Sequence, residues 1–388
     1  MVGDHNITIP RTPPAPFRRE LVFGFVAPLG ADKPKVLDAF KTAVKDTKYT
    51  FVRIDSSGLL EAYRSGSKDQ REGYLQRKRA LMDAGDALRA EWARHGDQRG
   101  DAVAIAAVSS IQDHRTAINI RAGLDANKAE RTPSGQVAYL IDSLKHPHEL
   151  ETLRRLYGPA FLAIGLYAQP KKREEYLLAR ARGEEDLVRE LIARDDRDRK
   201  ELGQRVSDAF YICDFIVDAT KPDHRIEASM KRLFRLVFGD PHVTPTRDEL
   251  GMYLARAAQV RSGSLARQIG AAVLRDDGSV VSVGTNEVAK PIIGGQYWPK
   301  DDERYGGRDR VYRLRDTSDE FRADMVSDAL DRLGDYGALT QELARKPSDE
   351  RLNELYFVDD APLRKSKIKD NIDYIRAVHA EAAAIIDA

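Results

Sequence analysis

The stretch ELVFGFVAPLGADKPKVLDAF, residues 20–40, decides the fold of the first part of the chain. It opens with an apolar run, passes through a turn rich in glycine, alanine and proline, and then places Val36, Leu37 and Phe40 at helical spacing. This pattern predicts a strand, a turn and a helix in that order. A second apolar run, Tyr49–Asp55, follows after the length of a helix, so the unit is βαβ-like and favours a parallel sheet.

Three further apolar runs predict strands of the same sheet: Gln136–Asp142, Ala160–Ala168 and Asp214–Thr220. They are uninterrupted, as strands must be when helices cover both faces of a parallel sheet. Long charged helices are predicted between the strands, notably Leu75–Arg94 and Lys171–Val206. The second of these is rich in opposite charges three and four positions apart, which is typical of a helical face in water.

The composition limits the classes of protein to which the chain belongs. Its 388 residues predict two or three domains, and 63 Lys and Arg against 62 Asp and Glu give no general attraction to nucleic acid or acidic membranes. The apolar runs are about half as long as a membrane span. Residues 1–20 read as a disordered or extended proline-rich arm, without the apolar core of a signal peptide. A single cysteine, Cys213, excludes a disulfide framework and is expected to be a buried packing residue, so we expect a cytoplasmic protein with no membrane partner.

Turn-forming residues at positions 238–245 interrupt the helical pattern, and we place a domain boundary there. Residues 21–243 form the first predicted domain and residues 244–388 the second. The second domain begins with a helix and continues with two apolar strands joined at Asp277-Gly278, a hairpin signal. A long polar insertion, residues 288–378, is expected to contain two helices.

The loop after the first strand lies where α/β folds bind phosphates, because backbone N–H groups and a helix dipole converge there. The loop is not a Walker A sequence: the spacing from Gly24 to Gly30 is one residue too long. Ala31 and Asp32 also stand where lysine and serine or threonine are expected. The candidate nucleotide-binding residues are Gly24, Pro28, Gly30, Ala31, Asp32, Lys33 and Asp142.

Charged residues near this loop have alternative roles. A lysine, Lys33 or Lys35, either reaches the phosphates or points to water. Asp142 either organises a magnesium ion with the nucleotide or caps the helix predicted in SLKHPHELETL. The domain resembles a P-loop nucleotide kinase with a degenerate catalytic loop. This favours nucleotide binding or sensing over phosphoryl transfer, because transfer without the Walker lysine loses on the order of several kcal/mol of electrostatic stabilisation. A purely structural domain is the remaining alternative.

The segment VHAEAAAIIDA, residues 378–388, contains half of a metal site. His379 and Glu381 stand two apart at the start of an alanine-rich helix, and the small Ala380 between them leaves room for both side chains. Zinc deaminases bind their metal through one histidine and two cysteines, and a glutamate two residues after the histidine transfers the proton. The alternative is a surface or capping histidine followed by an unrelated glutamate.

The surrounding sequence matches a known family. An arginine precedes IGAAV, a GTN turn follows, and RAVHAEAAAI supplies the helix, in the order α-β-β-α. The second domain resembles the deoxycytidylate deaminases, and the tandem resembles the bacterial antiphage dCTP/dCMP deaminases, the AvcD-like proteins. The fold class implied is an α/β protein: a P-loop nucleotide-kinase-like parallel sheet followed by a partial cytidine-deaminase-like α/β/α domain. The family's P-C-x-x-C motif is absent, so we expect its two zinc cysteines beyond Ala388, and no tight zinc binding or activity without them.

The resemblance also implies roles for individual residues. His379 ligates one zinc ion and Glu381 is the catalytic proton carrier. Asn286 faces the sugar, with a purely structural turn residue as the alternative; Tyr297 and Trp298 close over the substrate, unless they belong to a solvated surface insert.

The reaction implied is deamination of dCTP or dCMP to dUTP or dUMP, which depletes the nucleotide pool during phage infection. The implied partners are deoxycytidine nucleotides, a regulatory nucleotide on the first domain, an inhibitory small RNA and further copies of the chain. The alternative function is a nucleotide- or RNA-sensing regulator with a catalytically incomplete deaminase module.

Overall fold

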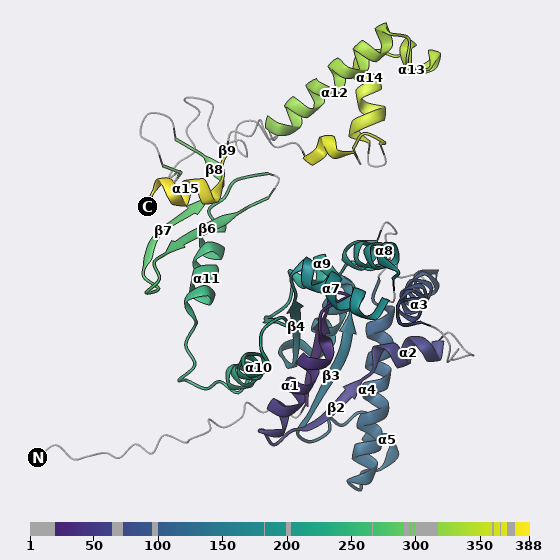
Figure 1. Ribbon diagram of the computed structural model, residues 1–388, viewed down its shortest axis with the longest axis vertical. Coiled ribbons are helices and arrows are strands. Elements are labelled where there is room, and N and C mark those ends of the chain that lie inside the picture. Colours follow the sequence, from purple (N-terminus) through teal and green to yellow (C-terminus); the bar gives the residue numbers. More distant parts are fainter. Residues whose placement is uncertain are drawn as a thin grey trace, which may run out of the picture. The chain divides into compact units, whose positions relative to one another are not determined.

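The computed structural model describes residues 20–63, 73–94, 100–181, 183–198, 203–265, 267–290, 295–296, 298, 317–358, 361–364, 366–370 and 377–388. The chain divides into two compact units, Met1–Val243 and Thr244–Ala388 (Figure 1). The proline-rich arm, except for Glu20, lies outside the described residues, as do Tyr297 and much of the insertion.

The first unit is built on a parallel sheet of five strands in the order β2-β3-β1-β4-β5. The strands are β1 (Glu20–Val26), β2 (Thr50–Ile54), β3 (Val137–Leu144), β4 (Phe161–Tyr167) and β5 (Phe215–Asp218). Each of them overlaps one of the apolar runs that the sequence marks as a strand, with β3 continuing beyond its run to Leu144, and every pairing between neighbours is parallel. The predicted α/β class with a parallel sheet is therefore confirmed for this unit.

Helices cover both faces of this sheet (Figure 1). Successive residues of a strand point to opposite faces, so Leu21 and Phe23 of β1 join one hydrophobic core and Val22 and Val26 join the other. The first core is closed by α1 and α10, and the second by α4, α6 and α9. The helices of the unit are α1 (Lys33–Lys45), α2 (Ser56–Tyr63), α3 (Tyr74–Arg94), α4 (Ala102–Arg121), α5 (Ala126–Ala129), α6 (Pro147–Tyr157), α7 (Pro170–Ala181), α8 (Glu185–Asp196), α9 (Val206–Phe210) and α10 (Asp223–Val237).

The segment predicted as one solvated helix, Lys171–Val206, has a different structure. It contains two helices, α7 and α8, which are separated near Gly183, where φ is +96°. Leu177, Val188 and Leu191 are fully buried in a third hydrophobic cluster formed by α3, α7 and α8. The predicted solvated face is present, because exposed ion pairs three and four positions apart, such as Arg189–Glu185, lie along it. The charge pattern also hides an apolar stripe that packs against α3, and this stripe was not predicted.

The second unit contains a hairpin between two helices. Strands β6 (Gly270–Leu274) and β7 (Val280–Thr285) are antiparallel, as predicted, and helix α11 (Arg247–Gln259) precedes them. A Cβ atom added at Gly270 would lie 2.0 Å from a backbone oxygen of α11, and one added at Gly284 would lie 2.1 Å from a backbone oxygen of α15 (Ala380–Ile386). Ala271 pairs with Gly284, so the two glycines belong to opposite faces of the hairpin. Helices α11 and α15 therefore cover opposite faces.

A second short ladder brings the end of the chain back to the hairpin. Strand β8 (Glu287–Val288) pairs antiparallel with β9 (Ala377–Val378), and Glu287 lies opposite Val378. Between them the insertion carries α12 (Thr317–Asp335), α13 (Gln341–Arg345), α14 (Ser348–Leu352), a π-helical turn (Asn353–Phe357) and a 3-10 turn (Lys367–Asp370). The insertion thus contains helices, as predicted. Helix α12 and Tyr356 of the π-helical turn form a small hydrophobic cluster.

Two further predictions concern single features. Among the described residues, no helix has both the length and the apolar character that crossing a membrane requires. Cys213 is half-buried and precedes β5, with its thiol near the carbonyl oxygen of Ala209 at 3.5 Å. Burial, together with the nearby carboxylate of Asp214, raises the pKa of the Cys213 thiol to about 12, so it is a packing group rather than a nucleophile.

Candidate functional site

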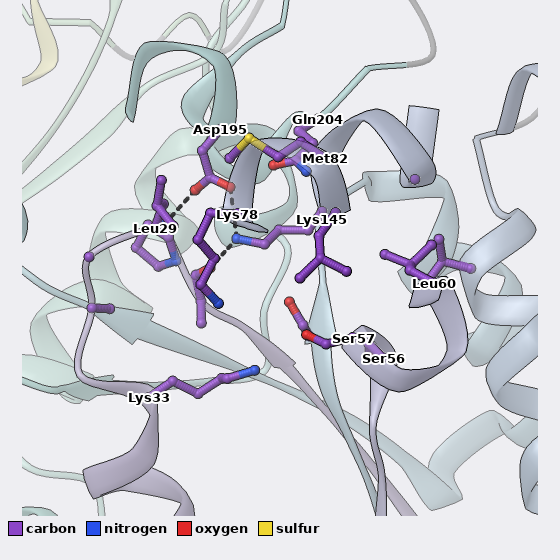
Figure 2. A pocket seen from close by; sticks show the side chains of 18 of the residues that line it. Leu29, Lys33, Ser56, Ser57, Leu60, Lys78, Met82, Lys145, Asp195 and Gln204 are labelled. Atoms are coloured by element: carbon purple, nitrogen blue, oxygen red, sulfur yellow. Dashed lines mark hydrogen bonds and ion pairs between the residues drawn. The ribbon is translucent and has the colours of Figure 1, made fainter. Parts of the chain in front are cut away.

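A cavity of about 270 Å³ opens in the first unit at the carboxyl ends of β1, β2 and β3 (Figure 2). In open α/β sheets, ligands bind at this edge of the strands. The loop after β1 forms one wall, the start of α2 another, and α3, α7 and α8 contribute side chains above the sheet. Of the predicted nucleotide-binding residues, Pro28, Gly30, Ala31 and Lys33 line the cavity.

The other three predicted residues are placed differently. Gly24 lies within β1, paired with Ile141 of β3 and Ala163 of β4. Asp32 caps α1, where its carboxylate accepts the backbone N–H of Lys35 at 3.5 Å. Asp142 is a buried residue of β3 next to the cavity.

Asp142 is a buried carboxylate at the centre of a charge cluster whose cations are partly exposed. Its Oδ2 accepts hydrogen bonds from Lys33 Nζ at 3.2 Å and from the Arg53 guanidinium at 2.5 Å, and its Oδ1 accepts the Ser56 N–H at 3.0 Å. Burial opposes ionisation, but the Lys33 charge and the hydrogen bonds from Arg53 and Ser56 outweigh it and lower the pKa of Asp142. The carboxylate therefore stays charged and ties β3 to the end of β2, the start of α2 and the start of α1.

The suggestion that Asp142 caps a helix was wrong. Helix α6 begins at Pro147, and its N-cap is His146, which forms a capping box with Glu149. Strand β3 continues to Leu144, beyond Asp142, because its apolar residues remain buried between α4 and α6.

The two lysines after the loop point in different directions. Lys33 lines the cavity, and burial lowers the pKa of its ammonium group, with Asp142 opposing the shift and Lys145 adding to it. Lys35 instead pairs with Asp223 at 2.8 Å and donates to the carbonyl oxygen of Lys221 at 2.9 Å, beside α10. Only Lys33 of this pair is placed to meet a ligand in the cavity.

Two further lysines reach the same cavity, and the sequence did not single them out (Figure 2). Lys78 comes from α3, and burial followed by repulsion from Lys33 and Lys145 lowers its pKa to about 8. Lys145 follows β3 and donates to Ala27 O at 2.6 Å and to the buried Asp195 at 2.8 Å. The cavity thus gathers three ammonium groups around one opening.

Polar atoms without partners also line this cavity. Ser56 Oγ, Arg89 Nε and Gln204 Oε1 are buried and have no hydrogen-bond partner within the described part of the chain. Buried polar groups are almost always hydrogen-bonded in native proteins. Together with the hydroxyl of Ser57 (Figure 2), these atoms are available to a polar ligand.

The second unit brings two of the deaminase candidates close together. In the β8–β9 ladder Glu287, which follows Asn286, pairs with Val378, which precedes His379. His379 is exposed and is the N-cap residue of α15, and Glu381 is exposed in the first turn of the same helix. Ala380, between them, is fully buried against the hairpin.

Asn286 is engaged inside the protein. Its Oδ1 accepts the N–H of Ile269 at 2.6 Å and the hydroxyl of Ser262 at 2.7 Å, and its Nδ2 donates to Arg267 O at 2.6 Å. Trp298 donates its indole N–H to Val288 O at 2.8 Å, which anchors it beside β8. These contacts give Asn286 a structural role in holding the loop before β6.

The described residues do not complete a metal site. They contain no group of three or more His, Cys, Asp or Glu side chains arranged to hold a metal ion. His379 is a single imidazole donor, whereas zinc sites need three or four protein ligands. A zinc ion is therefore not supported by the residues that the structure describes, and no reaction step is assigned to one.

Comparison with known proteins found relatives for part of the chain. A UPF0200 protein of Aeropyrum pernix is 34% identical over 123 residues, which are 31% of this chain and 63% of that protein. A UPF0200 protein of Methanothermobacter thermautotrophicus is 31% identical over 99 residues, 25% of this chain and 50% of that protein. The chain thus spans about half to just under two thirds of the length of these curated relatives. No protein-family model matches the chain.

These findings define the class of the first unit at a coarse level. The parallel sheet with β1 at its centre, the loop and helix that follow it, and the two relatives together support a P-loop-kinase-like domain. The relatives' name describes no activity.

Proposed function

We propose that the first unit binds a nucleotide in the cavity at the carboxyl ends of β1, β2 and β3. The three lysines of the cavity bind the phosphates, and the bound nucleotide regulates chemistry in the second unit. The observation that carries this proposal is the meeting of Lys33, Lys78 and Lys145 at the carboxyl edge of the sheet. Their mutual repulsion contributes to the lowered pKa values of Lys33 and Lys78. An anion bound among them relieves this repulsion, so binding energy is available for phosphate groups.

The remaining walls suit a nucleoside. Tyr74 and Tyr176 line the cavity together with Leu60 and Met82, which provides aromatic and apolar surface beside the charged groups. Ligand pockets typically combine such surface with a few polar groups that fix orientation. The cavity therefore has the mixed character that a phosphorylated nucleoside requires.

The same geometry argues against phosphoryl transfer by the first unit. Both oxygens of Asp142 already accept hydrogen bonds, and two cationic side chains lie against Oδ2. A magnesium ion at this carboxylate would be repelled by those charges, so the residues present do not fit a magnesium site. We therefore assign nucleotide binding, and no transfer step, to this cavity.

Nucleotide binding is tested by equilibrium dialysis of the full chain with dCTP and ATP. Lys78→Met should weaken binding about tenfold, because a charged hydrogen bond contributes about 1.5 kcal/mol or more. Lys35→Met is the matched control, because Lys35 pairs with Asp223 outside the cavity. Equal affinities of the two variants would remove the cavity from the proposal.

Chemical modification gives an independent measurement on the unaltered chain. With a pKa of about 8, Lys78 is substantially neutral at pH 8 and should react faster with an acylating reagent than an exposed lysine does. Bound nucleotide should protect Lys78 both by covering it and by raising its pKa. Unchanged labelling of Lys78 at saturating dCTP and ATP would contradict binding at this place.

For the second unit we propose deamination of deoxycytidine nucleotides, dCTP or dCMP, as part of antiphage defence. The supporting observation is the start of α15: His379 is its N-cap and Glu381 lies in its first turn, and the β8–β9 ladder ends at the pair Glu287–Val378, next to Asn286 and His379. Glu381 is exposed to a substrate, as a proton carrier must be. Completion of the zinc site requires thiolate ligands that are not among the described residues.

Deamination is tested with the full-length gene product by following ammonia release from dCTP and dCMP. Glu381→Gln should lower the rate by about 10² to 10⁴, the usual contribution of a general acid or base. Asp387→Asn is the control, because Asp387 is an exposed carboxylate at the other end of the same helix. Equal ammonia release from the Glu381→Gln variant would exclude Glu381 from the reaction; plating phage on cells that carry either form tests the defence role.

A regulatory protein with an incomplete deaminase module is the second candidate function. The observation that favours it is the exposed His379, which belongs to no group of metal-binding side chains among the described residues. Nucleotide binding by the full-length protein without any ammonia release supports this second function and contradicts the first.

A further inference from the structure

Asp195 links the phosphate-binding loop to helix α8. It is the second-last residue of α8 and is fully buried. Its Oδ2 accepts the backbone N–H of Leu29 at 2.6 Å, and its Oδ1 accepts Lys145 Nζ at 2.8 Å. A backbone N–H at the loop after β1 and a lysine ammonium are the kind of donors that bind a phosphate oxygen.

We infer that the carboxylate of Asp195 occupies an anion subsite of the cavity and is displaced by a phosphate group of the incoming ligand. This inference rests on the proposed nucleotide binding of the first unit. In the structure the carboxylate accepts the Leu29 N–H and pairs with the Lys145 ammonium (Figure 2). A phosphate that takes both donors releases Asp195, and with it one of the attachments of α8 to the loop.

A second observation shows that the subsite belongs to a ligand site rather than to a closed ion pair. Ser56 Oγ and Gln204 Oε1 line the same cavity, are buried and have no partner within the described residues. The Asp195–Lys145 pair therefore satisfies only part of the polar groups around the cavity. A larger polar ligand can satisfy the rest and replace the carboxylate as well.

The loop and the α7–α8 pair are held together at a second point. The Nε of Arg173, on α7, donates to Leu29 O at 2.8 Å, and its guanidinium pairs with Asp196 at 2.9 Å. Gly30 permits this approach: its φ is +88°, and an added Cβ would lie 2.6 Å from the Arg173 backbone oxygen. Loss of the Asp195 contact thus leaves this polar attachment and the packing of Leu29 against Val188 and Leu191, so α8 is loosened and not detached.

Two neighbouring aspartates provide a matched pair of variants. Asp195→Asn removes the competing charge, so the apparent affinity of the full chain for dCTP and for inorganic phosphate should rise about tenfold, because the binding-competent form becomes more populated. Asp196→Asn removes the same charge from the adjacent residue, which pairs with Arg173 instead. Its affinity should stay within about twofold of the unaltered chain, because the more distant charge is screened.

Hydrogen exchange of the unaltered chain tests the same inference without a variant. Saturating dCTP should accelerate amide exchange in α8 and leave α10 unchanged. Equal affinities of the Asp195→Asn chain and the unaltered chain, or slower exchange in α8 with ligand, would overturn the inference while nucleotide binding stands. Absence of dCTP and ATP binding by both chains would overturn the proposed nucleotide binding and this inference together.

Discussion

The two units place their candidate acidic residues in opposite environments. Asp142 in the first unit is 0% exposed and accepts hydrogen bonds from Lys33, Arg53 and the Ser56 N–H. Glu381 in the second unit is exposed in the first turn of a seven-residue helix. The position of Asp142 is fixed by its charged partners, whereas the position of Glu381 depends on how α15 packs on the hairpin. Replacing each acid should therefore affect stability very differently.

The largest effect on stability is expected for Asp142→Asn. The substitution leaves the partly exposed Lys33 and Arg53 without their shared anion, and hydrogen bonds to a charged group contribute up to about 3 kcal/mol. Urea unfolding of the first unit, followed by Trp92 fluorescence in a chain with Trp298→Phe, measures the loss. Asp55→Asn is the control: Asp55 is exposed and lies 3.7 Å from Arg53, so about 0.5 kcal/mol is expected.

The same variant has a defined pH signature. The pKa of Asp142 is lowered in the folded chain, so its contribution to stability is present in full above the unfolded-state value, about 4, and is lost as the pH falls through the folded-state pKa. Asp142→Asn should reduce this acid dependence and lie closest to the unaltered chain at low pH. A constant difference in unfolding free energy across that range would show that the charge of Asp142 does not stabilise the fold.

An intermediate effect is expected at Gly284, where packing rather than charge sets the geometry. A Cβ at this position would lie 2.1 Å from Ala380 O and 2.4 Å from Ala384 N, both backbone atoms of α15. Gly284→Ala should push the helix away and destabilise the second unit by about 2 kcal/mol. The fluorescence of Trp298, in a chain with Trp92→Phe, reports the unfolding of this unit.

Gly334→Ala separates this packing effect from a general cost of alanine. Gly334 lies inside α12, and an added Cβ would approach side chains alone: the end of Arg351 at 3.2 Å and Leu339 at 3.7 Å. Alanine is favoured over glycine inside a helix by about 1 kcal/mol, so this variant should be as stable as the unaltered chain or more stable. Equal losses at Gly284 and Gly334 would mean that α15 does not depend on close contact with the hairpin.

The contrast between the units also explains what the sequence could predict. All five strands of the first unit were recognised because buried parallel strands are uninterrupted apolar runs, and helix Leu75–Arg94 was placed within one residue of α3. The hairpin was recognised from Asp277-Gly278. These features are encoded locally, by hydrophobic periodicity and turn chemistry.

The site in the first unit was predictable only where it follows from strand position. Pro28, Gly30, Ala31 and Lys33 line the cavity because they follow β1, and by the same rule Ser56 and Lys145, after β2 and β3, were open to prediction. Lys78 and Asp195 were not, because they lie in charged helices whose pattern is also that of a solvated face. Their burial is produced by the packing of α3, α7 and α8, which no local pattern specifies.

The smallest effect on stability is expected for Glu381→Gln, and it decides what kind of residue Glu381 is. The carboxylate is exposed and interacts favourably with the start of α15, so its loss should cost about 0.5 kcal/mol or less. Unfolding of the second unit, followed by Trp298 fluorescence with Trp92→Phe in place, measures this value. A loss comparable to that of Asp142→Asn would show that Glu381 is a structural anion in the folded protein, and reduced ammonia release from the variant would then reflect unfolding. A small loss of stability together with a large loss of activity is the combination that a catalytic carboxylate produces, because its free energy is used with the substrate and not in the fold.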